Sequence, residues 1–163
     1  MHKKIYILTT IFFILDQISK SIISTFLSLN ENIVIIKNFF SINYINNKGA
    51  SWGILSNARI LLIVLSIICI IILFRYMNTF KINKRNILAF GMILGGILGN
   101  LSDRIFFGYV IDFLNFKIIN YNFPVFNLAD TFIVVGVILL ITAIIKGEDK
   151  NGSKSNRRKR KNW

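Results

Sequence analysis

Long apolar stretches alternate with shorter polar segments along the 163 residues of the chain. Four stretches are dominated by Ile, Leu, Phe and Val, and each approaches the roughly 20 residues that a helix needs to cross the hydrocarbon core of a bilayer. They occupy residues 5–26, 58–76, 87–107 and 127–145. The pattern therefore predicts four transmembrane helices.

Two segments between these spans, residues 27–57 and 108–126, have a different pattern. Residues 40–44 alternate apolar and polar side chains, which is typical of a short strand. We expect a turn or loop at residues 46–49, and residues 115–126, which hold the only proline, alternate less clearly. The predicted fold class is an all-α membrane protein with four transmembrane helices and a small extracytoplasmic β-rich platform.

The positive charges predict how the spans are oriented. The net charge is +13, and 14 of the 20 Lys and Arg residues lie at Lys3 and Lys4, between Arg75 and Arg85, or from Lys146 onward. Cations gather on the cytoplasmic side of membrane proteins, so we expect both termini to be cytosolic. Residues 1–146 then form an integral-membrane domain. Residues 147–163 form a basic, disordered cytosolic tail that is attracted to anionic membrane lipid rather than to nucleic acid.

Four aspartates lie in or beside the apolar stretches, where insertion measurements put the cost of a charge at about 2.5–3.5 kcal/mol. They are Asp16, Asp103, Asp112 and Asp130. Such residues persist when they pair, line a cavity or perform chemistry. The single histidine, His2, is terminal and the single cysteine is Cys69. We therefore expect no Ser-His-Asp triad, no zinc site of the His/Cys kind and no cofactor.

Asp16 and Lys20 are four residues apart, so they share a helix face and can neutralise each other. They also interrupt the first apolar stretch, which we interpret as a retained helix rather than a cleaved signal peptide. In the third stretch, glycines recur at four-residue spacing from Gly91 to Gly99, which favours close helix packing. This packing would bring residues 100–104 against a neighbouring helix. We expect Arg104 to pair with the adjacent Asp103.

Asp112 and Asp130 follow the third span and open the fourth, so both are expected at the outer face, meeting across a helix interface. Two carboxyl groups in contact hold one proton between them, and such a pair can activate water and protonate a carbonyl oxygen without a metal. Intramembrane aspartates also serve as proton relays or structural pairs. The neutral amides of Asn47, Asn100 and Asn127 could orient the carboxylates or hold a substrate backbone.

Five segments, in order along the chain, resemble the motifs of lipoprotein signal peptidase, also called signal peptidase II. Residues 16–20 resemble its D-x-x-x-K element and residues 47–53 its N-x-G-A-x-F-G block. Residues 95–104 look like G-G-x-x-G-N-x-x-D-R, residues 110–113 match V-x-D-F, and residues 126–130 match F-N-x-A-D. The departures are Trp52 in place of phenylalanine and Asn46 where many members have arginine.

The resemblance implies an aspartic endopeptidase of the bacterial cytoplasmic (inner) membrane. Its substrates would be prolipoproteins carrying a diacylglyceryl group, cut on the N-terminal side of the lipobox cysteine, and we expect a monomer. Asp112 and Asp130 match the catalytic pair. The positions that match substrate-binding or supporting residues are Asn47, Gly49, Asn100, Arg104, Asn127, Ala129, Asp16, Lys20 and Asp103.

Two other functions are compatible with parts of the pattern. A small proton- or ion-conducting membrane protein would use the aspartates along a path and would cleave nothing. A Ser/Lys peptidase would use Lys20 or Lys48 as base with a serine such as Ser24 or Ser51. Flux measurements and serine-to-alanine variants, respectively, would identify them.

Overall fold

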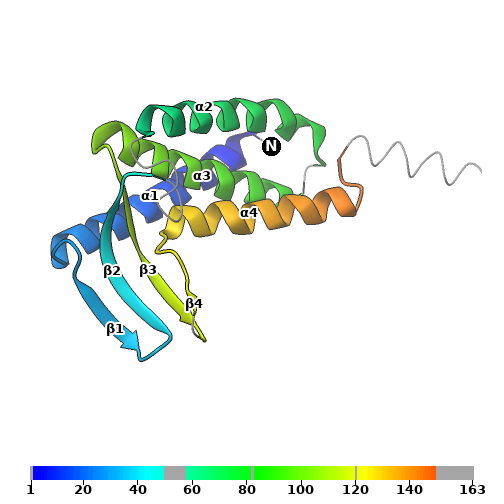
Figure 1. Cartoon of the computed structure of the whole chain (residues 1–163). Coiled ribbons are helices and arrows are strands. Elements are labelled where there is room, and N and C mark those ends of the chain that lie inside the picture. Colours follow the sequence, from blue (N-terminus) through cyan, green and yellow to red (C-terminus); the bar gives the residue numbers. More distant parts are fainter. Residues whose placement is uncertain (1, 50–57, 82, 120, 150–163) are drawn as a thin grey trace, which may run out of the picture.

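Four long helices form the body of the molecule in a computed structural model, which describes residues 2–49, 58–81, 83–119 and 121–149 (Figure 1). The helices are α1 (His2–Phe26), α2 (Arg59–Tyr76), α3 (Lys84–Phe106) and α4 (Leu128–Ile145), and a short 3₁₀ turn, η2 (Met77–Thr79), follows α2. All four helices are long and apolar enough to cross a membrane. This confirms the predicted fold class and shifts the predicted helix ends by at most three residues.

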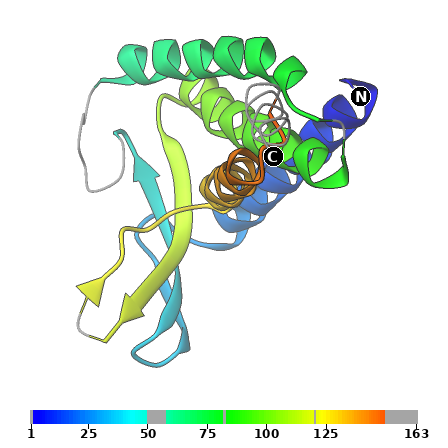
Figure 2. The ribbon, with the colours of Figure 1, turned by 90° about the vertical axis from the view of Figure 1, so that its right-hand side faces the viewer.

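Helix α3 is the centre of the bundle, because it packs against each of the other three helices (Figure 2). Most of its residues between Ala89 and Asp103 are buried. Helix α2, which the structure describes in full, has no buried residue and exposes isoleucine and leucine around its surface. In a bilayer this apolar surface can face lipid, whereas polar groups are held inside the bundle on α3.

Glycines allow α3 to approach its neighbours closely, as the four-residue spacing predicts. A Cβ atom on Gly91 would lie 2.6 Å from Cβ of Leu8, and one on Gly95 would lie 2.6 Å from Cβ of Phe12, both on α1. Farther along α3, a Cβ on Gly99 would collide with the carboxylate of Asp16. The glycine face of α3 therefore determines how closely α1, with its charged residues, can approach α3.

A four-stranded antiparallel sheet extends from one end of the bundle, with strand order β1-β2-β3-β4 (Figure 1). Its strands are β1 (Asn32–Ile36), β2 (Phe40–Asn47), β3 (Val110–Ile118) and β4 (Tyr121–Asn122). The predicted strand at residues 40–44 is real but longer. Asn46 and Asn47, which were expected in a turn or loop, are paired with Ile111 and Val110 instead. The cross-strand hydrogen bonds to β3 extend the strand through these asparagines.

The sheet is fixed to the bundle by a small apolar core. Ile111 and Phe113 of β3 are buried against Ile23 of α1, and Leu128 at the start of α4 packs on the same cluster. These contacts hold β3 between the ends of α1 and α4. They therefore determine where Asp112, which lies between Ile111 and Phe113, is presented.

Some expectations concern residues outside the described ranges. These are residues 50–53 of the block that begins at Asn47, including Ser51 and Trp52, and residues 150–163 of the basic tail.

Candidate functional site

Asp112 is a buried carboxyl group held by two side-chain amides. It lies on β3 opposite Ile45 of β2, next to a register shift between Ile42 and Ile45. Its side chain is 3% exposed. Asn47 donates through Nδ2 to Oδ2 of Asp112 at 2.7 Å, and Asn127 donates through Nδ2 to Oδ1 at 2.7 Å. Burial, followed by the charge of Asp130, raises the pKa of Asp112 from 3.8 to about 7, although both amides oppose the rise.

Asp130 is fixed in the first turn of α4. Asn127 is the N-cap of this helix and Asp130 is the third helical residue, a combination that forms a capping box. The backbone N–H of Asp130 donates to Oδ1 of Asn127 at 3.0 Å, and the backbone N–H of Asn127 donates to Oδ2 of Asp130 at 3.2 Å. The remaining oxygen, Oδ1, accepts from Nδ2 of Asn100 at 2.8 Å. The sequence Asn-Leu-Ala-Asp thus both begins the helix and orients the carboxylate.

Asn127 connects the two carboxyl groups. Its backbone and side-chain oxygen hold Asp130, and its side-chain amide nitrogen holds Asp112. Asn127 itself is fully buried. Asp112 and Asp130 are therefore joined through Asn127 and not across a helix interface, because Asp112 comes from a strand and Asp130 from a helix start. Strand β3 begins only four residues after α3 ends, which places Asp112 on a strand beside the helix ends.

A buried ionic cluster lies directly behind this pair. The ammonium group of Lys20, 2% exposed, contacts Oδ2 of Asp16 at 2.8 Å and Oδ2 of Asp103 at 2.9 Å. It also donates to Oδ1 of Asn100 at 2.9 Å. The predicted Asp16–Lys20 pair is confirmed. Because Asn100 contacts both Lys20 and Asp130, the ionic cluster and the paired carboxylates form one network.

Asp16 extends the network to the start of α4, where its Oδ1 accepts from the backbone N–H of Ala129 at 2.9 Å. Gln17 completes the cluster, and its importance was missed in the sequence. Its Nε2 donates to Asp16 at 3.2 Å and to Asp103 at 3.0 Å. The sequence feature that could have indicated its role is the polar amide of Gln17 directly after Asp16 inside an apolar span.

Arg104 does not pair with Asp103, contrary to expectation. Consecutive residues on a helix point in different directions, and Asp103 is held by Lys20 and Gln17. Arg104 instead donates to the carbonyl of Asn100 and to the carbonyl of Gly49, both at 3.3 Å. Gly49 in turn donates through its N–H to Oδ1 of Asn47 at 2.9 Å. The guanidinium thus links α3 to the end of β2 beside Asp112.

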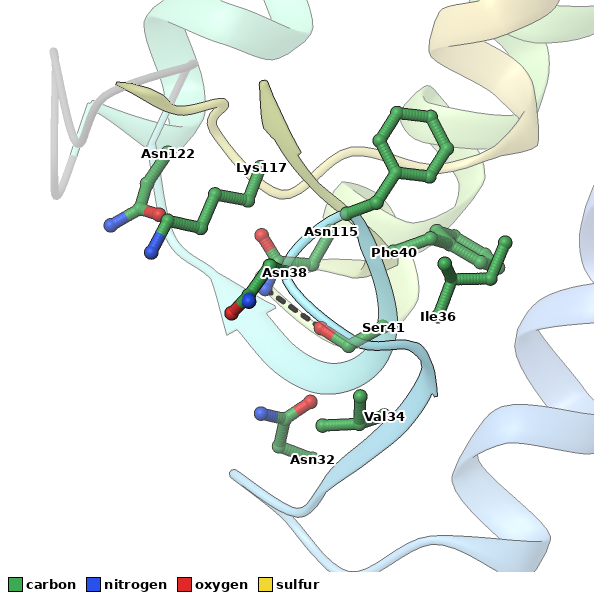
Figure 3. A pocket seen from close by; sticks show the side chains of 10 residues that line it. Asn32, Val34, Ile36, Asn38, Phe40, Ser41, Asn115, Lys117 and Asn122 are labelled. Carbon is green, nitrogen blue, oxygen red and sulfur yellow. Dashed lines mark hydrogen bonds between the residues drawn. The ribbon is translucent and has the colours of Figure 1, made fainter. Parts of the chain in front are cut away.

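Two hollows lie near the sheet. An apolar groove of about 400 Å³ reaches Asp130 along α4. It is lined by Phe123, Phe126, Asp130, Thr131, Ile133, Val134 and Val135. A second hollow, of about 190 Å³, lies on the sheet among polar side chains, where Nδ2 of Asn115 donates to Oγ of Ser41 (Figure 3). Only the first contains a member of the carboxylate pair.

Comparison with known proteins shows which family the chain belongs to. The family model of signal peptidase (SPase) II matches residues 8–146. The chain belongs to the signal peptidase II family. A lipoprotein signal peptidase of Halothermothrix orenii is 43% identical over 137 residues, covering 84% of this chain and 92% of the relative. One of Staphylococcus aureus is 38% identical over 152 residues, covering 90% and 93%.

Solved structures agree with the fold of this signal peptidase II chain. A bacterial membrane enzyme solved by the in meso method is 34% identical and superimposes with a TM-score of 0.78, covering 87% of each chain. A second enzyme solved by the same method is 33% identical with a TM-score of 0.73. Membership of an aspartic peptidase family directs attention to the paired carboxyl groups and away from the serine and ion-conduction alternatives. Lys20, moreover, is held by three acceptors rather than by a serine.

Proposed function

We propose that Asp112 and Asp130 are the catalytic dyad of this signal peptidase II chain. Family membership makes the chain an aspartic peptidase that removes signal peptides from prolipoproteins. The observation that carries the assignment is the bridge through Asn127, a fully buried residue that holds both carboxyl groups in one hydrogen-bonded network. The proposed supporting residues are those that complete this network: Asn47, Gly49, Asn100, Arg104, Asn127, Ala129, Asp16, Lys20 and Asp103.

The dyad would act by sharing one proton. Two buried carboxyl groups that interact cannot both ionise without a large cost, so one is protonated near neutral pH. The ionised member takes a proton from water as the water oxygen attacks the scissile carbonyl carbon. The protonated member donates to the carbonyl oxygen. The interaction between Asp112 and Asp130, which contributes to the raised pKa of Asp112, supports this coupling.

The charge distribution supports an orientation with both termini in the cytosol of a bacterium. The N-terminus and the C-terminal end of α4 lie at the end of the bundle opposite the sheet (Figure 1). Basic residues Lys3, Lys81, Lys84 and Lys146 belong to that end, as the positive-inside pattern requires. The dyad would then lie near the outer face of the cytoplasmic membrane, with the sheet outside.

This position suits a diacylated prolipoprotein as substrate. Acyl chains gain about 0.8 kcal/mol per buried CH₂ in lipid, so the membrane itself would hold the modified cysteine at a fixed depth. Presenting a bond at the depth of the catalytic groups contributes to catalysis by orientation. The apolar groove that reaches Asp130 supports the proposal because it places apolar surface beside a carboxylate. We expect the enzyme to act as a monomer and to require no cofactor.

The decisive experiment compares two forms of one lipobox peptide, diacylated and unlipidated, incubated with the purified protein. We expect cleavage of the diacylated form before the lipobox cysteine. Asp112→Asn and Asp130→Asn should abolish cleavage while the protein remains folded and inserted. Asp149→Asn, which makes the same change at the opposite end of the bundle, is the matched control and should cleave normally. Turnover retained by either dyad variant would remove that residue from the dyad.

A further inference from the structure

The two proposed catalytic carboxyl groups have different surroundings, and the difference bears on which of them holds the shared proton. This inference rests on the proposed function, because it assumes that Asp112 and Asp130 act together. The charged groups that face the dyad come from every element packed around it. They are Asp16 and Lys20 of α1 and Asp103 and Arg104 of α3, in addition to the charge that each dyad member presents to the other.

The surroundings of Asp130 are positive. Its carboxylate lies at the N-terminus of α4, where aligned peptide dipoles place roughly half a positive charge. A backbone N–H of that helix start donates to one oxygen and the amide of Asn100 donates to the other. Arg104 interacts electrostatically with Asp130 more strongly than with Asp112. Each of these contacts favours a negative charge on Asp130.

Lys20 determines which end of the Asn100 amide faces Asp130. An ammonium group can only donate hydrogen bonds, so the oxygen Oδ1 of Asn100 must face Lys20, which it meets at 2.9 Å. Nδ2 then necessarily points toward Asp130, at 2.8 Å. The same Oδ1 accepts from Asn127 at 3.1 Å, which adds a second reason for this orientation. The charge of Lys20 also polarises the amide, which strengthens its donation.

Asp112 has weaker support for a charge. The donors to its two oxygens are the neutral side-chain amides of Asn47 and Asn127. It lies within β3 of the antiparallel sheet and not at a helix start, and β-sheets have only small net dipoles. The positive potential at the site is therefore greater at Asp130 than at Asp112.

We infer that the shared proton resides on Asp112 and that Asp130 is the ionised partner. Lys20 is then a positioning residue, which acts on Asp130 through the amide of Asn100 without touching the reacting atoms.

The assignment gives each step of hydrolysis a defined proton transfer. Asp130 accepts a proton from water as the water oxygen bonds to the carbonyl carbon, and Asp112 gives its proton to the carbonyl oxygen. The resulting gem-diol has two hydroxyl groups. Its collapse breaks the C–N bond as Asp130 protonates the leaving nitrogen and Asp112 recovers a proton from a hydroxyl. Both carboxyl groups return to their starting states, with no other reactant consumed.

A matched pair of variants tests the assignment, because the two halves of the dyad each lose one amide donor. Asn100→Ala removes a donor from Asp130, and Asn47→Ala removes one from Asp112. The measurement is the pH profile of kcat/KM on the diacylated lipobox peptide, with the wild-type protein as reference. The acid limb reports ionisation of the first group and the alkaline limb reports loss of the second proton.

We expect Asn100→Ala to move the acid limb to higher pH by about one unit, the size of one lost charge-assisted hydrogen bond. Asn47→Ala should move the alkaline limb upward and leave the acid limb in place. If Asn100→Ala instead moved the alkaline limb and Asn47→Ala moved the acid limb, the proton would reside on Asp130 and the inference would be overturned. Movement of both limbs in both variants, or of neither, would also overturn it. Failure of the wild-type protein to cleave would instead reject the proposed function.

A second set of variants tests the role of Lys20. Asp16→Asn/Lys20→Met removes one ion pair as a unit, so Asp103 is the only carboxylate that loses Lys20 while remaining charged, and it keeps its hydrogen bonds from Gln17 and the backbone N–H of Ile111. We expect this double variant to move the acid limb upward as Asn100→Ala does. In an Asn100→Ala background the same change should move the limb by less, because the path through the amide is already absent and only the direct charge interaction between Lys20 and Asp130 remains to be lost. An equal additional shift there would show that Lys20 acts independently of Asn100.

Discussion

The two ends of the helix bundle each hold an acid paired with a base, and burial makes the two pairs different. Near the sheet, Lys20 lies between Asp16 and Asp103, with all three side chains at most 2% exposed. At the opposite end, Arg85 at the start of α3 pairs with Glu148 after α4, and both are more than 20% exposed. The first group is cut off from water and the second is not.

The comparison teaches that the same chemical pairing can serve two purposes. Buried charges must be satisfied by protein groups, and Lys20 accordingly has three acceptors. Because these acceptors hold Lys20 in one position, the cluster can fix the orientation of Asn100, which contacts Asp130 of the dyad. The pair at the opposite end joins the end of α4 to the turn before α3, where Asn83 also donates to Glu148 at 2.6 Å. Both side chains are partly exposed to water, so we interpret this pair as a tether between the two helices.

Removing the buried cation should have the largest effect. Lys20→Met leaves two buried carboxylates without their common partner, and breaking a buried pair in this way typically costs about 3–5 kcal/mol. We expect a large fall in the unfolding free energy, measured in detergent micelles, together with loss of cleavage. Arg85→Met is the matched control at the exposed end. Equal losses in the two variants would show that burial does not distinguish the two ends.

A methyl group at the α1–α3 interface should disturb the buried cluster selectively. In Gly99→Ala, the new Cβ would collide with the carboxylate of Asp16, which must shift and take Lys20 with it. A displacement of about 1 Å near catalytic groups can cost on the order of a hundredfold in rate, so we expect a fall of that order in kcat.

Gly91→Ala provides the control for that change. It also crowds α1, with Cβ of Leu8 at 2.6 Å, but it lies two helical turns away from the cluster. Both variants should lose thermal stability, whereas only Gly99→Ala should lose most of its activity. A similar loss of kcat in Gly91→Ala would mean that catalysis depends on the packing of the entire α1–α3 interface and not on the position of Asp16 alone.

Much of the buried end was predictable from the sequence. The spacing of Asp16 and Lys20, the glycines of α3 and the aspartates in apolar surroundings each predict contacts that the structure confirms. They are predictable because charge in an apolar span allows few stable arrangements. Asn47 was identified as a neutral amide that could orient a carboxylate and Gly49 through the family motif, and the structure connects them to Asp112 and Arg104.

Other features depend on tertiary contacts that local patterns do not specify. Strand β3 was not predicted because Val110–Ile118 is buried on both faces at its start and so does not alternate there. Its register with β2 includes an irregularity that decides what lies opposite Asp112. The pairing of Arg85 with Glu148 joins residues 63 positions apart and has no local signature.

The two ends should also respond in opposite ways to pH. Burial raises the pKa of Asp112 to about 7, so its proton is present below that value and is lost above it. The native state holds a proton that the unfolded chain releases near 3.8, so this group's contribution to stability decreases as pH rises toward 7. The shared-proton mechanism requires that proton. We therefore expect cleavage to decline above about pH 7, as measured by peptide turnover between pH 5 and 9.

Glu148 provides the contrast, because hydrogen bonding from Asn83, followed by its contacts with Arg85, lowers the pKa of Glu148 below 4.5. It therefore stays ionised throughout the range in which Asp112 titrates. Its contribution to stability is present above pH 4.5 and is lost only as pH falls below that range. A Glu148→Gln variant should have the same alkaline decline in cleavage as the wild-type protein, and a shifted decline would show that the two ends are coupled.

The smallest effect is expected from opening the exposed pair itself. In Arg85→Ala the carboxylate of Glu148 keeps its contacts with Asn83 and Asn86 and gains access to water, so no buried charge is left alone. The pair is partly exposed, and water and salt weaken a pair that they can reach. We expect a slight fall in melting temperature that disappears at high salt, with kcat and KM unchanged. A change in kcat would contradict the interpretation as a tether, because it would require the end of α4 to influence Asp130 through the length of the helix.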